Sequence, residues 1–183
     1  QQCSHRNPNQ TAYERRSGEV WPSHRITLTI PIIHITIRNM IPRFIQQNVI
    51  RMLKELRKIV IIVGPRQAGK TTLLKSLKDQ FETSNQITVY LNCDLDEDLK
   101  KVNTNSINLL SHLIKKIDYL FIDEAQRMDN PGLTLKIIHD NFPAVRVIAT
   151  GSSSFELKNK VSDALTGRFV DFHLFPLSQA EIS

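Results

Sequence analysis

Cysteine is scarce in this chain of 183 residues, which contains only Cys3 and Cys93. The two lie far apart, and neither belongs to a C-x-x-C pair or to a histidine spacing typical of a metal site. This shortage excludes a disulfide-stapled scaffold and favours a reducing, cytoplasmic setting. Because Cys93 ends an apolar run, we expect a buried, reduced thiol there.

The chain also lacks a hydrophobic run long enough to cross a membrane. The longest apolar stretch near the start, residues 26–37, is interrupted by Pro31, His34 and three threonines. It is shorter than the roughly 20 residues that a membrane-spanning helix needs, and it lacks the layout of a secretory signal. We therefore expect no membrane partner.

No block of five or six like charges is present, although the formal net charge is +6. Half of that excess lies in residues 1–40, which hold five arginines and two acidic residues. Trp21 and the tyrosines form no series with basic residues on which single-stranded bases could stack. A nucleic-acid partner thus has no direct support, and the charge is that of a mildly basic domain.

The two ends of the chain suggest how it divides into domains. Residues 1–25 are rich in Gln, Asn, Ser, Arg and Pro, whereas Met40 opens a clean helical pattern. We expect residues 1–40 to be a disordered or misassigned N-terminal extension. Residues 41–183 would form one domain, truncated at its C-terminus because "PLSQAEIS" stops within a continuing pattern.

From residue 41 onward, apolar periodicities typical of helices and strands alternate. Helices are predicted over 44–56, 70–81, 105–116, 131–140 and 153–165. Strands are predicted over 59–63, 87–93, 119–122, 145–150 and 169–174, with an acidic loop over 94–101. This alternation predicts an α/β fold with a mainly parallel sheet of about five strands and helices on both faces, a three-layer arrangement.

The stretch "IVIIVGPRQAGKTTLLKSL" contains the most specific motif of the chain, G-x-x-x-x-G-K-[ST] at residues 64–71. Gly64 and Gly69 would leave room for backbone N–H groups to surround a polyphosphate. Lys70 would contact the β- and γ-phosphates, and Thr71 would offer its hydroxyl to Mg²⁺. The predicted nucleotide-binding residues of the loop are Gly64, Pro65, Arg66, Gln67, Ala68, Gly69, Lys70, Thr71 and Thr72.

A second signal, "YLFIDEAQRM", ends a buried strand in two carboxylates. Burying charge is unfavourable unless a partner compensates it, and a metal-bound nucleotide would do so. Asp123 would hold Mg²⁺, and Glu124 would act as the general base for an attacking water. Gln126 and Arg127 follow, and would either couple the site to a partner or merely begin the next loop.

Two later motifs carry further candidates. In "VRVIATGSSSFEL", Thr150 or Ser152 would hydrogen-bond the γ-phosphate or the attacking water, unless the serines serve as a helix cap. In "LTGRFVDFHLFPLS", Arg168 would neutralise transition-state charge, in its own subunit or a neighbouring one. The alternative for Arg168 is a surface ion pair.

Taken in order, "GPRQAGKTTLL", "YLFIDEAQRM", "VIATGSSSFEL" and "LTGRFVDFHLFPLSQAE" resemble a family of prokaryotic AAA+-type P-loop ATPases. Members of that family follow the ATPase core with a winged-helix or nuclease-like region. The resemblance covers residues 41–183 and implies strand order 5-1-4-3-2. It also implies the roles given above for Lys70, Thr71, the acidic pair and the 150–152 turn, with Arg168 as an arginine finger.

These observations predict an ATP-binding, Mg²⁺-dependent ATPase domain that hydrolyses the β–γ phosphoanhydride bond. Three alternatives stay open: a small-molecule kinase, a nucleotide-dependent switch or DNA-associated module with slow turnover, and a truncated, inactive remnant. Whether the chain binds a protein partner or further copies of itself is likewise left open by the sequence.

Overall fold

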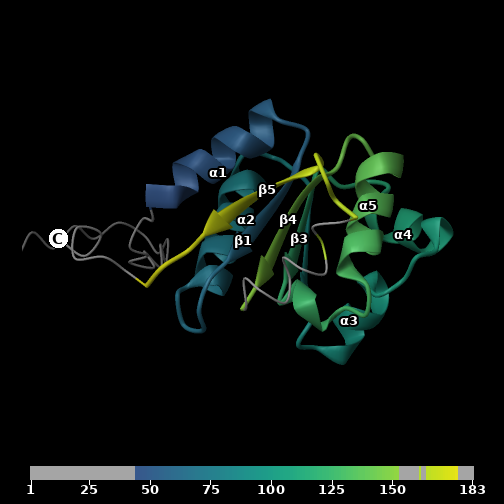
Figure 1. Ribbon diagram of the computed structural model, residues 1–183. Helices are drawn as coiled ribbons and strands as arrows, with labels where there is room; N and C mark the ends of the chain where they lie inside the picture. The colour runs from purple at the N-terminus through teal and green to yellow at the C-terminus, as the bar shows by residue number, and fades with distance from the viewer. Residues whose placement is uncertain (1–43, 153–160, 162–163, 177–183) are drawn as a thin grey trace, which may run out of the picture. The chain divides into compact units, whose positions relative to one another are not determined.

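The computed structural model describes residues 44–152, 161 and 164–176, and Figure 1 shows their arrangement. Five parallel strands form one sheet in the order β2-β3-β4-β1-β5. The strands are β1 (Ile59–Val63), β2 (Thr88–Asn92), β3 (Tyr119–Asp123), β4 (Arg146–Gly151) and β5 (Phe169–His173). Read from the other edge, this order is 5-1-4-3-2, so the predicted topology is confirmed.

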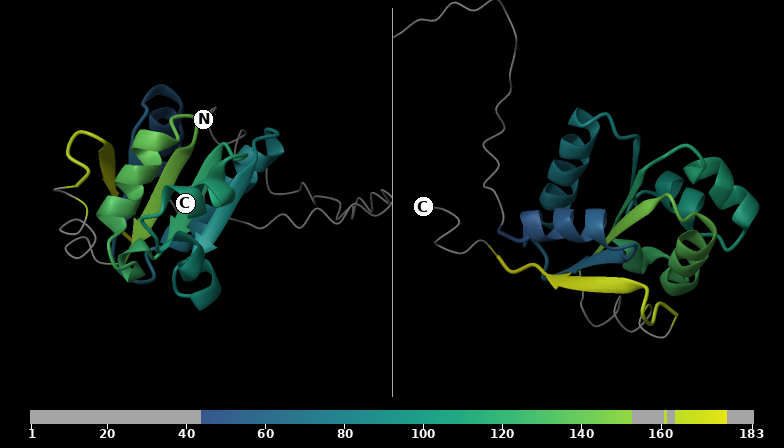
Figure 2. Two further views of the ribbon diagram at one scale, coloured as in Figure 1. Left: turned by 90° about the vertical axis from the view of Figure 1, so that its right-hand side faces the viewer. Right: turned by 90° about the horizontal axis from the view of Figure 1, so that it is seen from above.

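Helices cover both faces of the sheet (Figures 1 and 2). One face carries α1 (Phe44–Glu55) and α2 (Lys70–Thr83). The other carries α3 (Asp96–Val102), α4 (Ile107–Ile114) and α5 (Pro131–Asn141). A short 3₁₀ helix, η1 (Ala125–Arg127), follows β3. The predicted three-layer α/β fold is therefore confirmed.

Strand β1 shows why its sequence is a continuous run of branched residues. Ile59, Ile61 and Val63 pack into the core on the side of α3, α4 and α5, while Val60 and Ile62 pack against α1 and α2. Successive side chains of a strand point to opposite faces, so a central strand covered on both sides needs apolar residues throughout.

The predicted element boundaries agree with the structure to within about two residues, with one exception. The stretch 94–101, expected to be an acidic loop, contains helix α3. Its three acids lie in the first turn and Lys100 and Lys101 in the last, which suits the helix dipole. The sequence prediction was wrong here because the short helix has little apolar periodicity.

Two predictions fall largely or wholly outside the described residues. The expected extension, residues 1–40, lies entirely outside them. Most of the expected helix over 153–165 does so as well, and residues 164–168 form a turn. In the part of the chain that is described, no helix has both the length and the apolar character required to span a bilayer.

Candidate nucleotide-binding site

The loop between β1 and α2 begins at Gly64. The structure shows a steric need for glycine at this position that the sequence did not reveal. A Cβ atom there would lie 2.1 Å from the carbonyl oxygen of Leu174, just after β5. The Leu174 N–H in turn donates to the Val63 carbonyl over 2.7 Å. Gly64 therefore lets the end of β5 pack against the start of the loop, whatever else the loop binds.

The rest of the loop turns back through left-handed backbone conformations. Gln67 has φ 62° and Gly69 has φ 89°, and Gly69 is the N-cap residue of α2. Open space surrounds Gly69 at the Cβ position, so only its φ angle favours glycine there. Inside the loop, the Ala68 N–H donates to the Pro65 carbonyl over 3.3 Å. Arg66 and Gln67 are exposed and Ala68 is buried.

Lys70 starts α2 and is 5% exposed. Its Nζ donates to the carbonyl oxygens of Gly64 and Pro65, each over 2.9 Å. Both of these hydrogen bonds go to neutral acceptors, and the ion pairs found among the described residues do not include Lys70. A nearly buried ammonium group generally needs a compensating negative charge, so this position is suited to an anion.

Asp123 ends β3 and is 1% exposed. Its Oδ2 accepts hydrogen bonds from the Thr71 hydroxyl over 2.7 Å and from the Tyr90 hydroxyl over 2.9 Å. Its Oδ1 accepts one from the Thr150 hydroxyl. The predicted proximity of Thr71 and Asp123 is thus seen directly. Tyr90, on β2, is a contact that sequence reasoning missed.

Thr150, on β4, is fully buried, and its hydroxyl is used within the protein. It donates to Asp123 and accepts the Glu124 N–H over 3.1 Å. Strand β4 lies between β1 and β3, which places Thr150 next to Asp123 and Glu124. In this structure the Thr150 hydroxyl supports Asp123 and the backbone of Glu124, and a contact of Thr150 with phosphate or water stays a prediction.

Glu124 adopts a left-handed conformation with φ 53° and ψ 44°. Its carboxylate accepts a hydrogen bond from the Gln126 side-chain amide, which also donates to the Ser152 hydroxyl over 2.9 Å. Gln126, whose role was left open, therefore connects the predicted base to the serine turn after β4. Ser152 is partly exposed beside it.

An open pocket of about 430 Å³ lies at this end of the sheet. Its size falls in the usual range of small-molecule sites, about 300–1,000 Å³. The lining residues are Arg66, Gln67, Gly69, Lys70, Thr71, Thr72 and Glu124. Seven of the predicted site residues thus surround one cavity, at the carboxyl ends of the strands where such sheets bind ligands.

Arg168 lies at the opposite end of the sheet. Its carbonyl accepts the N–H of Ile59, the first residue of β1, whereas the loop follows the last residue of β1. Its Nε donates to Asp140 Oδ1 over 2.9 Å. Arg168 therefore cannot reach the pocket of its own chain, and a role within its own subunit is corrected to an ion pair. A contribution to a neighbouring subunit stays a prediction.

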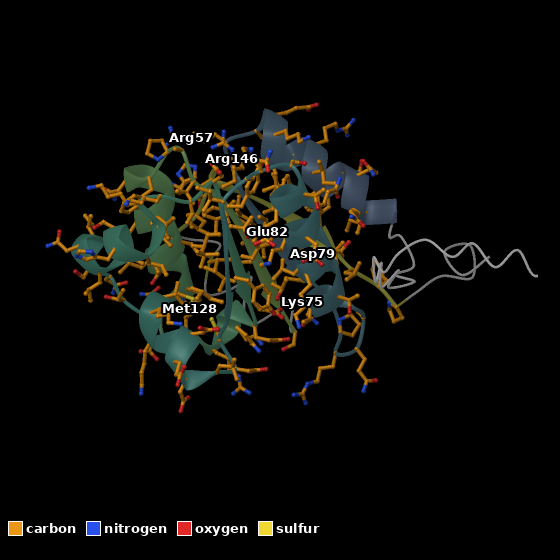
Figure 3. All side chains as sticks on the ribbon, turned by 180° about the vertical axis from the view of Figure 1, so that it is seen from behind. Arg57, Lys75, Asp79, Glu82, Met128 and Arg146 are labelled. Atoms are coloured by element: carbon orange, nitrogen blue, oxygen red, sulfur yellow. The ribbon has the colours of Figure 1, made fainter. Side chains whose placement is uncertain are left out.

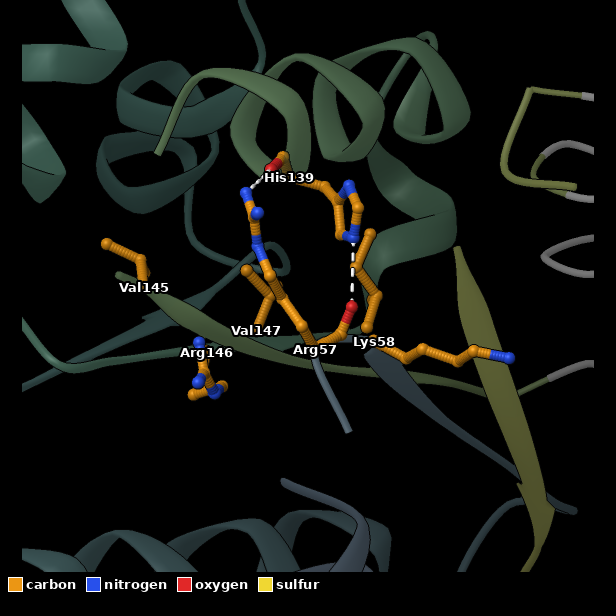
Figure 4. A pocket seen from close by; sticks show the side chains of 7 residues that line it. Arg57, Lys58, His139, Val145, Arg146 and Val147 are labelled. Carbon is orange, nitrogen blue, oxygen red and sulfur yellow. Dashed lines mark hydrogen bonds between the residues drawn. The ribbon is translucent and has the colours of Figure 1, made fainter. Parts of the chain in front are cut away.

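A second pocket near that end is much smaller, about 10 Å³, and basic (Figure 4). Arg57 donates to the His139 carbonyl over 3.2 Å, and His139 Nε2 lies 3.1 Å from the Arg57 carbonyl. Arg146 donates to the carbonyls of Leu53 and Pro143. These side chains connect helices to strands and leave too little room for a ligand.

Cys93 is buried as expected. Burial, followed by the negative charge of Asp123 and other nearby acids, raises the pKa of its thiol to about 12. The thiol is therefore neutral at physiological pH and is poorly suited to nucleophilic chemistry. Burial and Asp123 also raise the pKa of Tyr90, which keeps its hydroxyl a donor.

The donor set suits Mg²⁺ better than a softer metal. Thr71 and Asp123 present a hydroxyl and a carboxylate, both hard oxygen ligands, within 2.7 Å of each other. Among residues 44–152 and the other described positions, no group of three or more His, Cys, Asp and Glu could hold a metal alone. Mg²⁺ in proteins commonly takes one or two protein ligands and completes its shell with phosphates and water.

The five-stranded parallel sheet, the glycine-lysine loop and the adjoining acidic strand define a P-loop NTPase domain. The sequence pattern of the family described as AAA domain matches residues 56–183. The chain belongs to this AAA domain family. The expected resemblance to AAA+-type ATPases is thereby confirmed, while the expected C-terminal region remains a prediction. A comparison with curated proteins found no match.

Three solved structures share the fold. The AMPPCP-bound DnaA of Aquifex aeolicus has a TM-score of 0.53 at 19% identity, covering 70% of this chain and 44% of its own. The Walker-type ATPase PABY2304 of Pyrococcus abyssi has a TM-score of 0.57 at 16% identity, and the match covers 78% of this chain and 55% of that protein. PCH-2 of C. elegans has a TM-score of 0.50 at 16% identity, and the match covers 73% of this chain and 42% of that protein. The chain thus spans about half the length of these proteins.

Proposed function

We propose that this domain binds ATP with Mg²⁺ and hydrolyses the β–γ phosphoanhydride bond. The single observation that carries the proposal is the pairing of two features at one pocket. Among the described residues, the nearly buried Lys70 ammonium has carbonyl oxygens as its only acceptors, and the nearly buried Asp123 carboxylate lies 2.7 Å from the Thr71 hydroxyl. The first feature suits phosphate oxygens, and the second suits the hydrated cation that accompanies them. Membership of the AAA domain family supports the same function.

Binding would rest on the loop and on the first turn of α2. Backbone N–H groups of residues 64–71 and the N-terminal end of α2 would contact the phosphates, helped by the helix dipole. Lys70 would exchange its carbonyl contacts for the β- and γ-phosphate oxygens. Thr71 and Asp123 would hold Mg²⁺, which neutralises phosphate charge when bound.

Hydrolysis would rest on position and charge rather than on a covalent intermediate. Glu124 would accept a proton from a water whose oxygen bonds to the γ-phosphorus. The bond from that phosphorus to the bridging oxygen breaks, and ADP leaves with the bridging oxygen. Ser152, joined to Glu124 through Gln126, is the serine-turn hydroxyl we expect to contact the γ-phosphate or the water.

Thermal unfolding with and without Mg·ATP tests nucleotide binding. Ligand at about 100 times its dissociation constant should stabilise the folded state by about 2.7 kcal/mol. For a domain of this size, that corresponds to a rise in Tm of roughly 5–10 °C. Lys70→Ala should abolish the rise because it removes the cation that contacts the phosphates. Lys78→Ala, on the exposed face of the same helix, is the matched control and should keep it.

A wild-type protein whose Tm does not respond to Mg·ATP would refute the proposal and support the inactive remnant. Phosphate release without any added acceptor then separates hydrolysis from the kinase alternative, because a kinase needs an acceptor molecule. Binding without measurable release would favour the slow-turnover switch.

A further inference from the structure

Tyr90 contributes a hydrogen bond to the site from an unexpected element, the edge strand β2. The register pairs Tyr90 with Phe121 and Asn92 with Asp123. Tyr90 therefore lies two residues before the partner of Asp123 on β2, on the same face of the sheet, and is a diagonal neighbour of Asp123. Diagonal neighbours lie within reach of an aromatic side chain, which explains the 2.9 Å hydrogen bond from the Tyr90 hydroxyl to Asp123 Oδ2.

The ring of Tyr90 is held in place from the helix side. It is half-buried and packs against the core between the sheet and helices α1 and α2. The Lys75 ammonium lies 5.8 Å from the ring centroid, in the range of a cation–π contact. Lys75, labelled in Figure 3, is one turn after Thr71 on α2. The helix that bears Thr71 thus also restrains the tyrosine.

The hydrogen bonds of Asp123 divide unequally between its two oxygens. Oδ2 accepts from both Thr71 and Tyr90, and Oδ1 accepts from Thr150. A carboxylate oxygen has about two lone-pair positions, so both positions of Oδ2 are used. If the Thr71 hydroxyl turns to a cation, Tyr90 and Thr150 still hold the carboxylate, one on each oxygen.

We propose that Tyr90 is a positioning residue, whose hydroxyl fixes the carboxylate of Asp123 in the orientation that faces Thr71 and thereby raises the affinity of the site for Mg²⁺ with nucleotide. This inference rests on the proposed function, in which Asp123 holds the metal. Tyr90 acts through Asp123 and does not line the pocket. Outer-shell partners of this kind typically change metal affinity or activity by about 10–100-fold.

Calorimetric titration of ATP, at a series of Mg²⁺ concentrations and in EDTA, tests the inference without relying on turnover. Tyr90→Phe keeps the ring and removes the hydroxyl. We expect about a tenfold higher Mg²⁺ concentration for half-maximal enhancement of ATP binding. ATP affinity in EDTA should stay within about twofold, because Tyr90 does not line the pocket.

Tyr119→Phe is the matched control, since Tyr119 starts β3 at the opposite end of the sheet and stacks on Phe81 with ring centroids 3.9 Å apart. It should leave the Mg²⁺ dependence unchanged. Thermal unfolding of each variant without nucleotide establishes that it is folded. Thr150→Val gives a second reading, because it removes the hydroxyl from the other oxygen of the same carboxylate. Because both hydroxyls hold one carboxylate, the two single losses should not combine multiplicatively in the double variant.

The possible outcomes distinguish a failure of the positioning role of Tyr90 from a failure of the proposed ATPase function. A wild-type protein that does not bind Mg·ATP overturns both. If the wild type binds and Tyr90→Phe shows the same Mg²⁺ dependence, the inference fails and the proposed function stands. An equal loss in Tyr119→Phe, or strictly multiplicative losses in the double variant, would also overturn the positioning role.

Discussion

Glu124 combines three features that point to a role in the site. It follows a buried strand, it lines the pocket and its backbone is left-handed with φ 53°. A non-glycine residue in that conformation is strained by about 1–3 kcal/mol, and such strain is concentrated at functional sites. The bond from its N–H to Thr150 and the contact of its carboxylate with Gln126 maintain this conformation.

We expect Glu124→Gln to bind Mg·ATP normally but to release phosphate about 10²–10⁴-fold more slowly. The amide is nearly the same size as the carboxylate but cannot accept the proton from the attacking water. Calorimetry measures binding, and a phosphate-release assay measures turnover. Glu97→Gln, on the surface helix α3, is the control and should leave both unchanged. Turnover at the parental rate would eliminate Glu124 as the base.

At the scale of elements, the end of β5 packs closely against the start of the loop that follows β1. The two strands run parallel in register from Ile59 opposite Phe169 to Val63 opposite His173. Beyond this pairing, the Leu174 carbonyl occupies the space where a side chain at position 64 would lie. The loop therefore depends on β5 for its geometry, although β5 is distant in sequence.

We expect Gly64→Ala to lower the free energy of unfolding by about 3 kcal/mol in the absence of nucleotide. The new methyl group would collide with backbone rather than with a side chain that could rotate away, so the cost is at the upper end of overpacking effects. Urea denaturation without ligand gives this value. A variant as stable as the wild type would show that the loop and β5 separate easily.

Comparison with Gly69→Ala separates the destabilisation caused by steric contact from that caused by backbone conformation. Position 69 has φ 89° but no neighbouring atom within 4 Å of a Cβ, so the expected cost is about 1–2 kcal/mol from the left-handed backbone alone. The difference between the two glycine variants therefore isolates the contact with Leu174.

At the scale of the whole molecule, an ion-pair network ties the opposite end of the sheet together. Asp140, at the C-terminal end of α5, accepts a hydrogen bond from Arg168 Nε, and its Oδ1 lies 2.9 Å from His139 Nδ1. The Arg168 guanidinium, followed by His139, lowers the pKa of Asp140 from 3.8 to about 2. The network connects α5 to the start of β5, far from the pocket.

The lowered pKa has a definite consequence for stability against pH. The stabilising effect of ionised Asp140 is fully present above about pH 4 and is lost as pH falls through about 2. Asp140 is 37% exposed, so screening keeps the contribution below about 1 kcal/mol. The Tm difference between wild type and Asp140→Asn should therefore be small at pH 7 and should shrink between pH 4 and pH 2. A difference that does not change over this interval would contradict the assignment.

The amino-acid sequence by itself determined the features that depend on neighbours along the chain. The branched run 59–63, the glycine-lysine loop after it and the acidic end of strand 119–123 are contiguous signals, so their types and positions could be predicted. Parallel strand pairing also followed from the alternation of elements. The strand order came from the family resemblance rather than from any local pattern.

Only the tertiary structure decided which residues meet across the sheet. Tyr90 on β2 and Thr150 on β4 meet the Asp123 carboxylate because both strands lie beside β3 in register, and Thr71 reaches it from α2, which packs against β3. Arg168 lies near β1 in the sheet but at its opposite end, since parallel strands bring the residue before β5 beside the start of β1. Hydrogen bonds need partners within about 3 Å, and that proximity is set by the pairing of distant strands rather than by spacing in the sequence.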